Sequence, residues 1–546
     1  MPTLPLAPYV LLLSTHADPA DLSYQPGPPH HPIWGHLLVA RECSENLPPD
    51  IHPHVYANYL RRKYNLGKFF YLDFWPFGEQ FLFIADPEVA NQITVSSTLR
   101  KSPLETDYMN RLLGMSNMVG LEGAAWKVMR AMFNPGFASG HLMTLLPYII
   151  DATVVFGEAL REKARSGELF EMEELATRLT VDVVGKVTLD VDLNSQHSDH
   201  RIMAAFRKQA ALLPVGSPAN PFKGLMVMLT SPRIWYNGRK LDRYIGEALD
   251  QRYAMRSGAE KEGEGGKKKT RYAVDLALET YQRDFQDPGK KSGTGEGMDP
   301  TFRKSAIAQF KTFIFAGHDT TSSVTAWVYY LLHQHPDVHA KVVEELDSVL
   351  GPTTTSSAAD KIRAEPYLIN RLPYTTAVIK ETMRLFPPGS TIRLGNPSVN
   401  ITDPDPSHPS YGQPYPTAGF HVWVVAHAIH RNEVYFPKPA TFVPERHLEN
   451  PPNGPPFPDA KQHRDALRPF EKGPRNCIGQ ELAMIEIRVI IALTVGEFDF
   501  EAEYPEVGEA EKGKEESYML EGHRCYQVLK GSAKPKGGLP GRIRLR

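Results

Sequence analysis

Apolar side chains recur every three or four positions over most of the chain, a spacing that predicts amphipathic helices. The pattern is clearest over residues 142–165 and 171–191, which we expect to pack as two helices. Residues 306–334 predict a longer helix, and residues 480–495 another. Aromatic runs at 69–74 and 81–84 instead favour a pair of strands. The pattern therefore predicts a mostly helical chain with a few strands.

Two stretches rich in glycine and lysine, at 257–270 and 289–297, carry too few apolar residues to build a core. We expect both to be solvated loops around a short helix near 272–283. Their lysines could contact nucleic acid, but the 61 basic and 63 acidic residues of the chain nearly cancel. We therefore expect no nucleic-acid partner.

The three cysteines, Cys43, Cys477 and Cys525, are an odd number and form no Cys-x-x-Cys pair. Both facts argue against a disulfide framework and against a structural zinc site. The cysteine content therefore indicates a reducing, intracellular setting.

The N-terminal residues 4–13 are apolar but contain Pro5 and Pro8, and they reach only about half of the ~20 residues that a membrane span needs. The segment has no basic leader, which argues against a signal peptide. We therefore predict a short apolar segment over 1–25, not a full transmembrane span, followed by one domain over 26–546. Attachment to a membrane by other means and a shortened N-terminus both stay open.

The most informative segment is the loop at 470–479, which reads Phe-Glu-Lys-Gly-Pro-Arg-Asn-Cys-Ile-Gly and precedes the predicted helix at 480–495. Gly473 allows a tight turn, and Arg475 places a fixed cation near Cys477. The start of the helix stabilises negative charge on sulfur, and Gly479 leaves room for a flat, bulky group. The loop therefore suits a thiolate that binds a metal. The alternative is a buried structural cysteine before an amphipathic helix.

The predicted helix at 306–334 contains a polar stretch near its centre, Ala316-Gly317-His318-Asp319-Thr320-Thr321. A glycine followed by small polar residues weakens helix propensity where the helix should be strongest. We therefore expect the helix to open at Gly317 and to admit a ligand or water. A solvent-facing polar patch is the alternative. We expect His318 to be structural.

Two further pairs lie one helical turn apart: Glu381 with Arg384, and Trp126 with Arg130. Each pair shares a helical face, so its members can contact each other or a common partner. A surface ion pair, and a core tryptophan beside a surface arginine, are the ordinary alternatives. Arg446, in the segment Phe-Val-Pro-Glu-Arg, adds a charge between the first pair and the cysteine loop.

Together these segments resemble the cytochrome P-450 superfamily. The loop at 470–479 matches the family pattern Phe-x-x-Gly-x-Arg-x-Cys-x-Gly at every defined position, and 316–321 resembles the oxygen-binding helix. The proline-rich stretch at 26–35 resembles the family's hinge, and all segments follow the family's order. The resemblance implies a mainly α cytochrome P-450 fold with a small β-rich lobe near the N-terminus, and a haem-thiolate monooxygenase domain over 26–546. The missing anchor and the two Gly/Lys-rich stretches depart from the family.

The resemblance also assigns the residues that would hold haem, the iron-protoporphyrin cofactor. Cys477 would be the axial thiolate ligand of the iron, in a loop shaped by Gly473 and Gly479. The side chains that would contact the haem propionates are Trp126, Arg130, Arg393 and Arg475. The residues that would form a buried ion network bracing the haem-binding core are Glu381, Arg384 and Arg446.

For the activity, the resemblance implies insertion of one oxygen atom of O2 into an apolar small molecule. Asp319 and Thr320 would be the catalytic pair that delivers protons during cleavage of the O–O bond. Electrons from NADPH would come through a separate reductase, because the chain has no flavin or nicotinamide fingerprint. The residues that would offer this acidic partner a basic face are Lys127, Arg468 and Lys472.

The family resemblance further implies a place at the surface of the endoplasmic reticulum membrane. The largely apolar run at 222–229 falls where relatives have a loop that dips into the membrane. We expect peripheral membrane contact there, with core packing as the alternative.

Two other functions stay open: a haem-thiolate isomerase or dehydratase that acts on peroxides, and a non-catalytic haem-binding sensor. Asp319 together with Thr320 argues against the first, and a sensor would not need that pair. In finer detail, the segments 133–137 and 539–543 resemble fungal enzymes of secondary metabolism that oxidise aromatic polyketides of the sterigmatocystin and aflatoxin type. We therefore expect an aromatic or polyketide-like substrate in mycotoxin-type biosynthesis. Phe310, Phe313 and Ile314 fit an apolar ligand, but core packing explains them equally well.

Overall fold

The computed structural model describes residues 25–75, 78–97, 99–213, 223–261, 270–285, 298–352, 354–449, 464–504, 519–521 and 523–546. For residues 223–229 and 257–261 it describes the backbone alone. The N-terminal apolar segment, most of both Gly/Lys-rich stretches and the side chains of the expected membrane-contacting run therefore lie outside the described residues.

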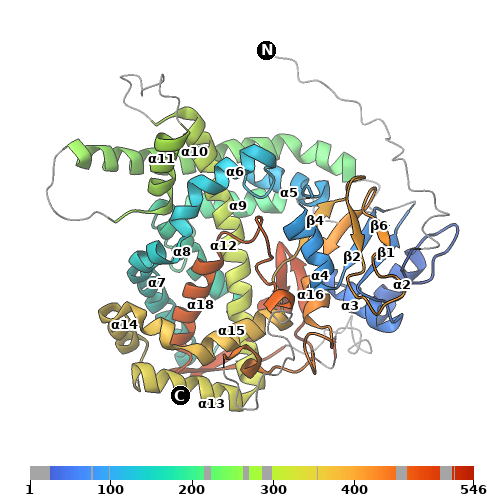
Figure 1. Cartoon of the computed structure of the whole chain (residues 1–546). Coiled ribbons are helices and arrows are strands. Elements are labelled where there is room, and N and C mark those ends of the chain that lie inside the picture. The colour runs from blue at the N-terminus through green and yellow to red at the C-terminus, as the bar shows by residue number, and fades with distance from the viewer. Residues whose placement is uncertain are drawn as a thin grey trace.

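Helices make up most of the described structure (Figure 1). The α-helices are α2 (Leu37–Asn46), α3 (His54–Lys63), α4 (Pro87–Asn91), α5 (Pro103–Leu113), α6 (Gly123–Phe133), α7 (Ser139–Ser166), α8 (Met172–Leu189), α9 (Arg201–Leu212), α10 (Lys223–Lys261), α11 (Ala273–Asp284), α12 (Pro300–Gln334), α13 (Pro336–Leu350), α14 (Thr355–Ala364), α15 (Pro373–Leu385), α16 (Ala426–His430) and α18 (Gln480–Thr494). Shorter helical segments include a π turn at Gln92–Ser96 and 3-10 turns at Asn134–Phe137, Pro366–Arg371, Pro444–His447 and Lys536–Gly538. The helices expected at 142–165, 171–191, 272–283 and 480–495 are confirmed as α7, α8, α11 and α18.

The strands are short and lie in small sheets. They are β1 (Phe69–Asp73), β2 (Gln80–Ile84), β3 (Phe170–Glu171), β4 (Thr391–Leu394), β5 (Asn400–Thr402), β6 (Pro414–Pro416), β7 (His421–Val424), β8 (Phe498–Ala502), β9 (Gln527–Lys530), β10 (Ser532–Pro535) and β11 (Pro540–Leu545). With so many helices around them, these small sheets confirm the expected mainly α fold.

The helix α12 runs through the middle of the helical part of the molecule, and most of its side chains are buried (Figure 1). It begins at Pro300, where the Asp299 carboxylate accepts the backbone N–H groups of Thr301 and Phe302. This is a favourable helix start, because the cap satisfies two donors that have no partner inside the helix. The helices α8, α10, α15 and α18 all contact α12. The expected long helix is confirmed, and its central position explains why it is apolar on several sides.

The expected opening of this helix at Gly317 is wrong, because α12 stays α-helical through that residue. A β-carbon at position 317 would lie only 2.6 Å from Cγ2 of Val184 in α8. The glycine therefore lets α8 and α12 approach closely, which explains its place in the helix without any local break.

The β-rich lobe contains a four-stranded sheet in the order β1-β2-β7-β4, with β1 antiparallel to β2 as the aromatic runs predicted. All five residues of β1 are buried. Phe69 and Tyr71 pack into one apolar cluster, whereas Phe70 and Leu72 pack into another on the opposite face. Successive side chains of a strand point to opposite faces, so a strand covered on both sides becomes continuously apolar.

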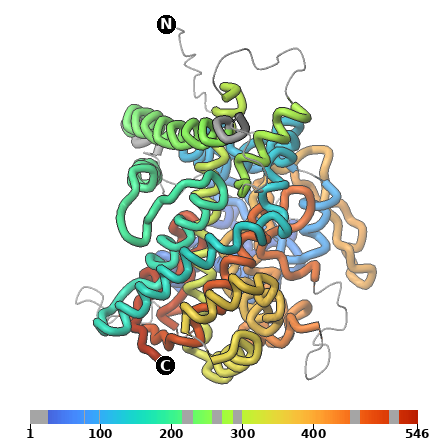
Figure 2. The backbone as a smooth tube through the Cα atoms, turned by 90° about the vertical axis from the view of Figure 1, so that its left-hand side faces the viewer, coloured from blue at the N-terminus to red at the C-terminus, as the bar shows by residue number. Residues whose placement is uncertain are grey.

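The C-terminal strands divide between two sheets. β9 and β10 form an antiparallel hairpin. β11 instead lies between β3 and β8 and contacts α7. In Figure 2 the red C-terminal end of the tube accordingly lies beside the teal part that contains α7. Among the described helices, α7 alone is long and apolar enough to cross a membrane by length and composition, yet nine of its residues are buried within the protein.

Candidate functional site

The cysteine loop folds back on itself just before α18. The backbone N–H of Cys477 donates to the carbonyl of Phe470 at 2.9 Å, and that of Asn476 donates to the carbonyl of Gly473 at 3.1 Å. Gly473 has a positive φ of 79°, and a β-carbon there would lie 2.1 Å from the carbonyl oxygen of Thr94. Only glycine fits this turn, so the local sequence explains how the loop presents its cysteine.

The thiol of Cys477 differs from the other two cysteines, since it is exposed while Cys43 and Cys525 are buried. Even so, burial among surrounding protein atoms raises the pKa of Cys477, and the Gly479 backbone N–H and the Arg130 cation partly offset this rise. A thiol that is deep in the protein and still accessible faces an internal space. This is the geometry that a ligand to a buried prosthetic group needs.

A second accessible patch lies on α12. Ala316 is exposed, although most of this helix is buried. The Thr320 hydroxyl donates to the Ala316 carbonyl at 2.8 Å, and this bond is also exposed. α12 and α18 contact each other, so the open surface on α12 and the open thiol before α18 belong to neighbouring elements (Figure 1). A flat group fits between two such accessible surfaces.

A cluster of cations lies nearby in the β-rich lobe and the loops that join it. Arg393 in β4 is only 2% exposed, and its Nε atom has no hydrogen-bond partner among the described residues. Burial lowers the pKa of Arg393, of Arg475 and of Lys101. Nearby carboxylates, Glu105 and Glu122, partly offset this lowering of the pKa. A buried guanidinium with an unused N–H is costly unless an anion completes it. The cluster therefore fits the carboxylates of haem.

Trp126 and Arg130, expected to share one partner, have different ones. The Arg475 guanidinium lies over the Trp126 ring, 4.3 Å from its centroid. Arg475 also pairs with Glu122 and donates to the Leu121 carbonyl at 2.7 Å. Arg130 instead donates to Asn476 in the cysteine loop. In this structure Arg130 therefore contacts the thiolate side of the site.

The ion network expected around Glu381 is present and fully buried. Arg384 donates to both carboxylate oxygens of Glu381 at 2.8 Å, and Arg446 lies 3.3 Å from Glu381. His447 adds a contact at 2.8 Å that the sequence analysis did not include. Burial alone would raise the pKa of Glu381, but Arg384 and His447 hold it far below its ordinary value. Arg384 also donates to the carbonyls of His430, Pro439 and Thr441, so the network joins α15 to the segments before the cysteine loop.

Asp319 and Thr320 lie side by side in α12 but use different partners. The Asp319 carboxylate is buried and pairs with Lys534 of β10 at 2.7 Å, and one of its oxygens has no hydrogen bond among the described residues. The Thr320 hydroxyl is turned to Ala316. The structure therefore brings the two residues to one turn of helix without joining their side chains.

The expected basic face is only partly present. Lys127 is exposed and Lys472 is half-buried. Including Arg468 was wrong, because its side chain is buried, pairs with Glu471 at 2.6 Å and donates to the Thr94 hydroxyl at 2.8 Å. Its charge is used inside the protein, so it cannot meet a partner at the surface.

Phe313 packs its ring against Phe133 and Phe137, with ring centroids 5.3 and 4.9 Å away. Phe310 and Ile314 belong to the same buried apolar cluster. Core packing therefore accounts for these three residues of α12.

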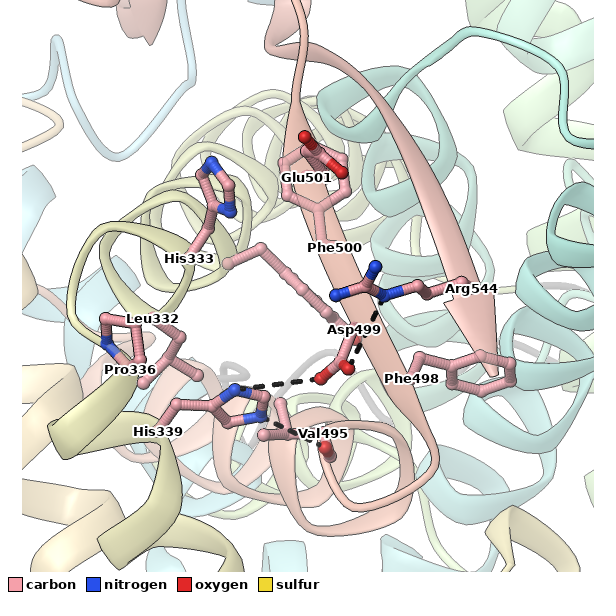
Figure 3. Close-up of a pocket in the computed structure, with 11 residues that line it drawn as sticks. Leu332, His333, Pro336, His339, Val495, Phe498, Asp499, Phe500, Glu501 and Arg544 are labelled. Carbon is pink, nitrogen blue, oxygen red and sulfur yellow. Dashed lines mark hydrogen bonds and ion pairs between the residues drawn. The ribbon is translucent and has the colours of Figure 1, made fainter. Parts of the chain in front are cut away.

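A surface pocket of about 400 Å³ lies where α12 and α13 meet β8 (Figure 3). His339 lies between the Val495 carbonyl, at 3.4 Å, and the Asp499 carboxylate, at 3.8 Å. Arg544 of β11 approaches the other oxygen of Asp499 at 3.7 Å. These polar groups already satisfy one another, and the pocket contains none of the expected site residues, so it is a structural junction.

Sequence reasoning missed several residues around the site: Lys101, Glu122, His447, Glu173 and Lys534. His447 carried a signal, since it directly follows the Phe-Val-Pro-Glu-Arg segment. Lys534 carried none, because it lies far along the chain from Asp319.

Comparison with known proteins agrees with this arrangement. Residues 25–520 match the model of the family described as cytochrome P-450. The chain is 38% identical over 524 residues to cytochrome P-450 monooxygenase acrF of Aspergillus aculeatus, across 91% of this chain and 98% of that protein. It is 34% identical over 523 residues to cytochrome P-450 monooxygenase polC of Polytolypa hystricis, across 95% and 89%. A third relative, cytochrome P-450 monooxygenase ptmG of Penicillium ochrochloron, is 28% identical over 520 residues, also across 95% and 89%.

Proposed function

Because the chain belongs to the cytochrome P-450 family and is a haem-dependent monooxygenase, we propose that it oxidises an apolar, aromatic or polyketide-like small molecule in fungal secondary metabolism. The observation that carries this proposal is the match to fungal monooxygenases over nearly their whole length. Three residues of α12 pack in the core and therefore give no support for the substrate class: Phe310, Phe313 and Ile314. The substrate class rests on the relatives and on the resemblance of 133–137 and 539–543.

We assign Cys477 as the ligand of the haem iron, and Gly473 and Gly479 as the residues that shape its loop. Arg393 and Arg475 suit the propionates, because they belong to a buried cationic cluster with an unused N–H. The Trp126 ring stabilises Arg475 by a cation–π contact with its guanidinium. Bound haem supplies a thiolate-ligated iron that can activate O2.

Asp319 and Thr320 are the residues we assign to proton delivery. The Thr320 hydroxyl occupies the accessible patch of α12, where it would be a hydrogen-bond donor toward the haem site once it leaves the Ala316 carbonyl. Asp319, one residue away and buried, lies behind the hydroxyl and can pass a proton toward it. Thr320 is thus the donor at the accessible surface, and Asp319 is the carboxyl group behind it.

For electrons, we assign a separate NADPH-dependent reductase that docks on the exposed Lys127 side of the cysteine loop. Lys127→Glu should weaken this docking and reduce its dependence on salt. Lys208→Glu, at an exposed lysine of α9, is the matched control. Equal losses of reductase binding in both variants would exclude a specific docking surface at Lys127.

We also assign the enzyme to the surface of the endoplasmic reticulum membrane, with residues 222–229 as the contact. Leu225→Glu and Met228→Glu should release the full-length chain from liposomes in a flotation experiment. Unchanged flotation by a folded variant would contradict this contact.

The function itself is tested by two measurements on the haem-loaded enzyme. Apolar polyketides should shift the spectrum of the oxidised haem, whereas polar compounds of similar size should not. Product formation should require NADPH, O2 and the reductase together. Turnover of a hydroperoxide without reductase would instead indicate the isomerase or dehydratase, and absence of turnover with spectral binding would indicate a sensor.

A further inference from the structure

One lysine of the C-terminal hairpin is shared by two buried carboxylates. The Nζ atom of Lys534 lies 2.7 Å from Oδ1 of Asp319 in α12 and 2.6 Å from Oε1 of Glu173 in α8. Burial alone would lower the pKa of Lys534, but the two carboxylates together raise it above its ordinary value. The ammonium is therefore charged and ties three elements together at the proton-delivering residue.

The hairpin also fixes the backbone around Asp319. The Ser532 hydroxyl donates to the Asp319 carbonyl at 3.1 Å, and the Ser323 hydroxyl of α12 donates to the Ala533 carbonyl at 2.8 Å. Gly531 has a φ of +85°, and a β-carbon there would lie 2.8 Å from Oδ2 of Asp319. Four successive hairpin residues, 531–534, thus contact one turn of the helix.

Glu173 has further partners, whereas Asp319 has few. The Thr177 and Ser322 hydroxyls donate to Glu173 at 2.9 and 3.1 Å. Oδ2 of Asp319 has no hydrogen bond among the described residues. The other titratable groups whose charge interacts with Asp319 are His318 on the same helix and Tyr108 of α5. Among the described residues, Lys534 is therefore the charged side chain in direct contact with the Asp319 carboxylate.

From this arrangement we propose that Lys534 is a positioning residue for proton delivery: its ammonium fixes the Asp319 carboxylate beside Thr320, so that the C-terminal hairpin sets the orientation of the carboxyl group that delivers protons. The proposal rests on the role of Asp319 given above. Without the ammonium, the buried carboxylate would lose its main partner and the contact that fixes its orientation.

The direct test is the infrared difference spectrum between Lys534→Met and the unchanged protein at neutral pH, which needs no turnover. A difference band in the carboxyl region should appear, because a buried carboxyl group has lost its ammonium partner. It should persist in Glu173→Gln/Lys534→Met and vanish in Asp319→Asn/Lys534→Met, which assigns it to Asp319. Lys534→Arg, which keeps the charge, should lack the band. Lys530→Met, at an exposed lysine of the same hairpin, is the matched control.

In turnover, Lys534→Met should keep the thiolate spectrum and substrate binding but form about ten- to a hundredfold less product per NADPH consumed, because a positioned group has been displaced. Lys534→Arg should restore most of the coupling. A missing infrared band, or full coupling with only a lower melting temperature, would overturn the proposal and leave Lys534 a structural residue. Should the methionine variant not fold, Lys534→Gln receives the same measurements. If Asp319→Asn itself is fully coupled, the assigned role of Asp319 fails, which is a different result from a failure at Lys534 alone.

Discussion

Arg130 of α6 donates two hydrogen bonds to Asn476, the residue before Cys477: one to its backbone carbonyl at 2.7 Å and one to its side-chain oxygen at 3.0 Å. A planar guanidinium can make both bonds at once, which a lysine cannot do. The cation thereby holds the loop and acts on the thiol at the same time, since it lowers the pKa of Cys477 against the effect of burial.

Arg130→Met should raise the pKa of Cys477, because the cation that favours the thiolate is gone. The thiolate form then persists over a narrower pH range and converts to the thiol form at a higher pH than in the unchanged protein. The carbon-monoxide difference spectrum, recorded as a function of pH, measures this conversion. Arg165→Met, at an exposed arginine of α7, serves as control. An unchanged pH profile in Arg130→Met would show that the bonds to Asn476 are purely structural.

Cys477→Ser should abolish the carbon-monoxide band of the thiolate-ligated haem. Cys43→Ser and Cys525→Ser should keep it, because both thiols are buried and burial raises their pKa, for Cys43 to about 12. Neither can supply a thiolate at neutral pH. Persistence of the band in the Cys477 variant would refute the ligand assignment.

Thr320→Ala should keep the thiolate spectrum and substrate affinity but consume NADPH with about ten- to a hundredfold less product, as expected when one acid–base group is removed. The uncoupled part of the NADPH consumption should then release hydrogen peroxide, which is measured per NADPH. Thr325→Ala removes a similar bond, from a hydroxyl to the carbonyl four residues earlier in α12, and should stay coupled. If Thr320→Ala only loses stability, the hydroxyl merely supports the helix.

Arg384→Met should lower the free energy of unfolding by ~3–5 kcal/mol, because it leaves the buried Glu381 carboxylate without its main partner. Arg363→Met removes an arginine that pairs at the surface with Asp360, at the same i,i+3 spacing, and with Asp151, and it should cost about 0–1 kcal/mol per pair. Denaturant unfolding of both variants gives the comparison. Equal losses of unfolding free energy in the two variants would mean that burial of the network does not add to its contribution to stability.

Stability should fall as the pH drops below about 6.5, because several buried histidines stay neutral in the folded protein. Burial lowers the pKa of His52 to about 4 and that of His430 to about 3. His430 accepts the N–H of Arg468 at one ring nitrogen, which a protonated ring could not do. The unfolded chain takes up these protons first, so each such histidine costs about 1.4 kcal/mol per pH unit on acidification.

His52→Gln removes one of these proton uptakes and should flatten the fall of the melting temperature between about pH 6.5 and 4. His197→Gln, at an exposed histidine, is the matched control. An unaltered slope in His52→Gln would mean that His52 takes up its proton equally in both states.

The sequence predicts those parts of the site whose members lie close together in the chain. The turn at Gly473, the thiol of Cys477 and the pair Glu381–Arg384 each fall within one loop or one helical turn, so spacing alone reveals them. β1 was also predictable, because a strand buried on both faces is apolar at every position.

The remaining errors concern contacts between distant segments. Arg468 looks like a surface cation in sequence. Its burial depends on how α4 packs against the segment that carries Arg468, whose guanidinium donates to the Pro87 carbonyl of α4. Gly317 looks like a helix breaker, and only Val184 in α8 explains it. Lys534 could not be assigned either, since nothing local indicates that a hairpin strand ends against α12.

The central place of β11 between β3 and β8 has a consequence for how the protein is made. The ribosome must translate residue 545 before this sheet can close, although β3 leaves the exit tunnel long before. A premature stop codon upstream of β11 therefore removes the strand that joins two distant parts of the chain, and leaves β3 and β8 without the partner between them.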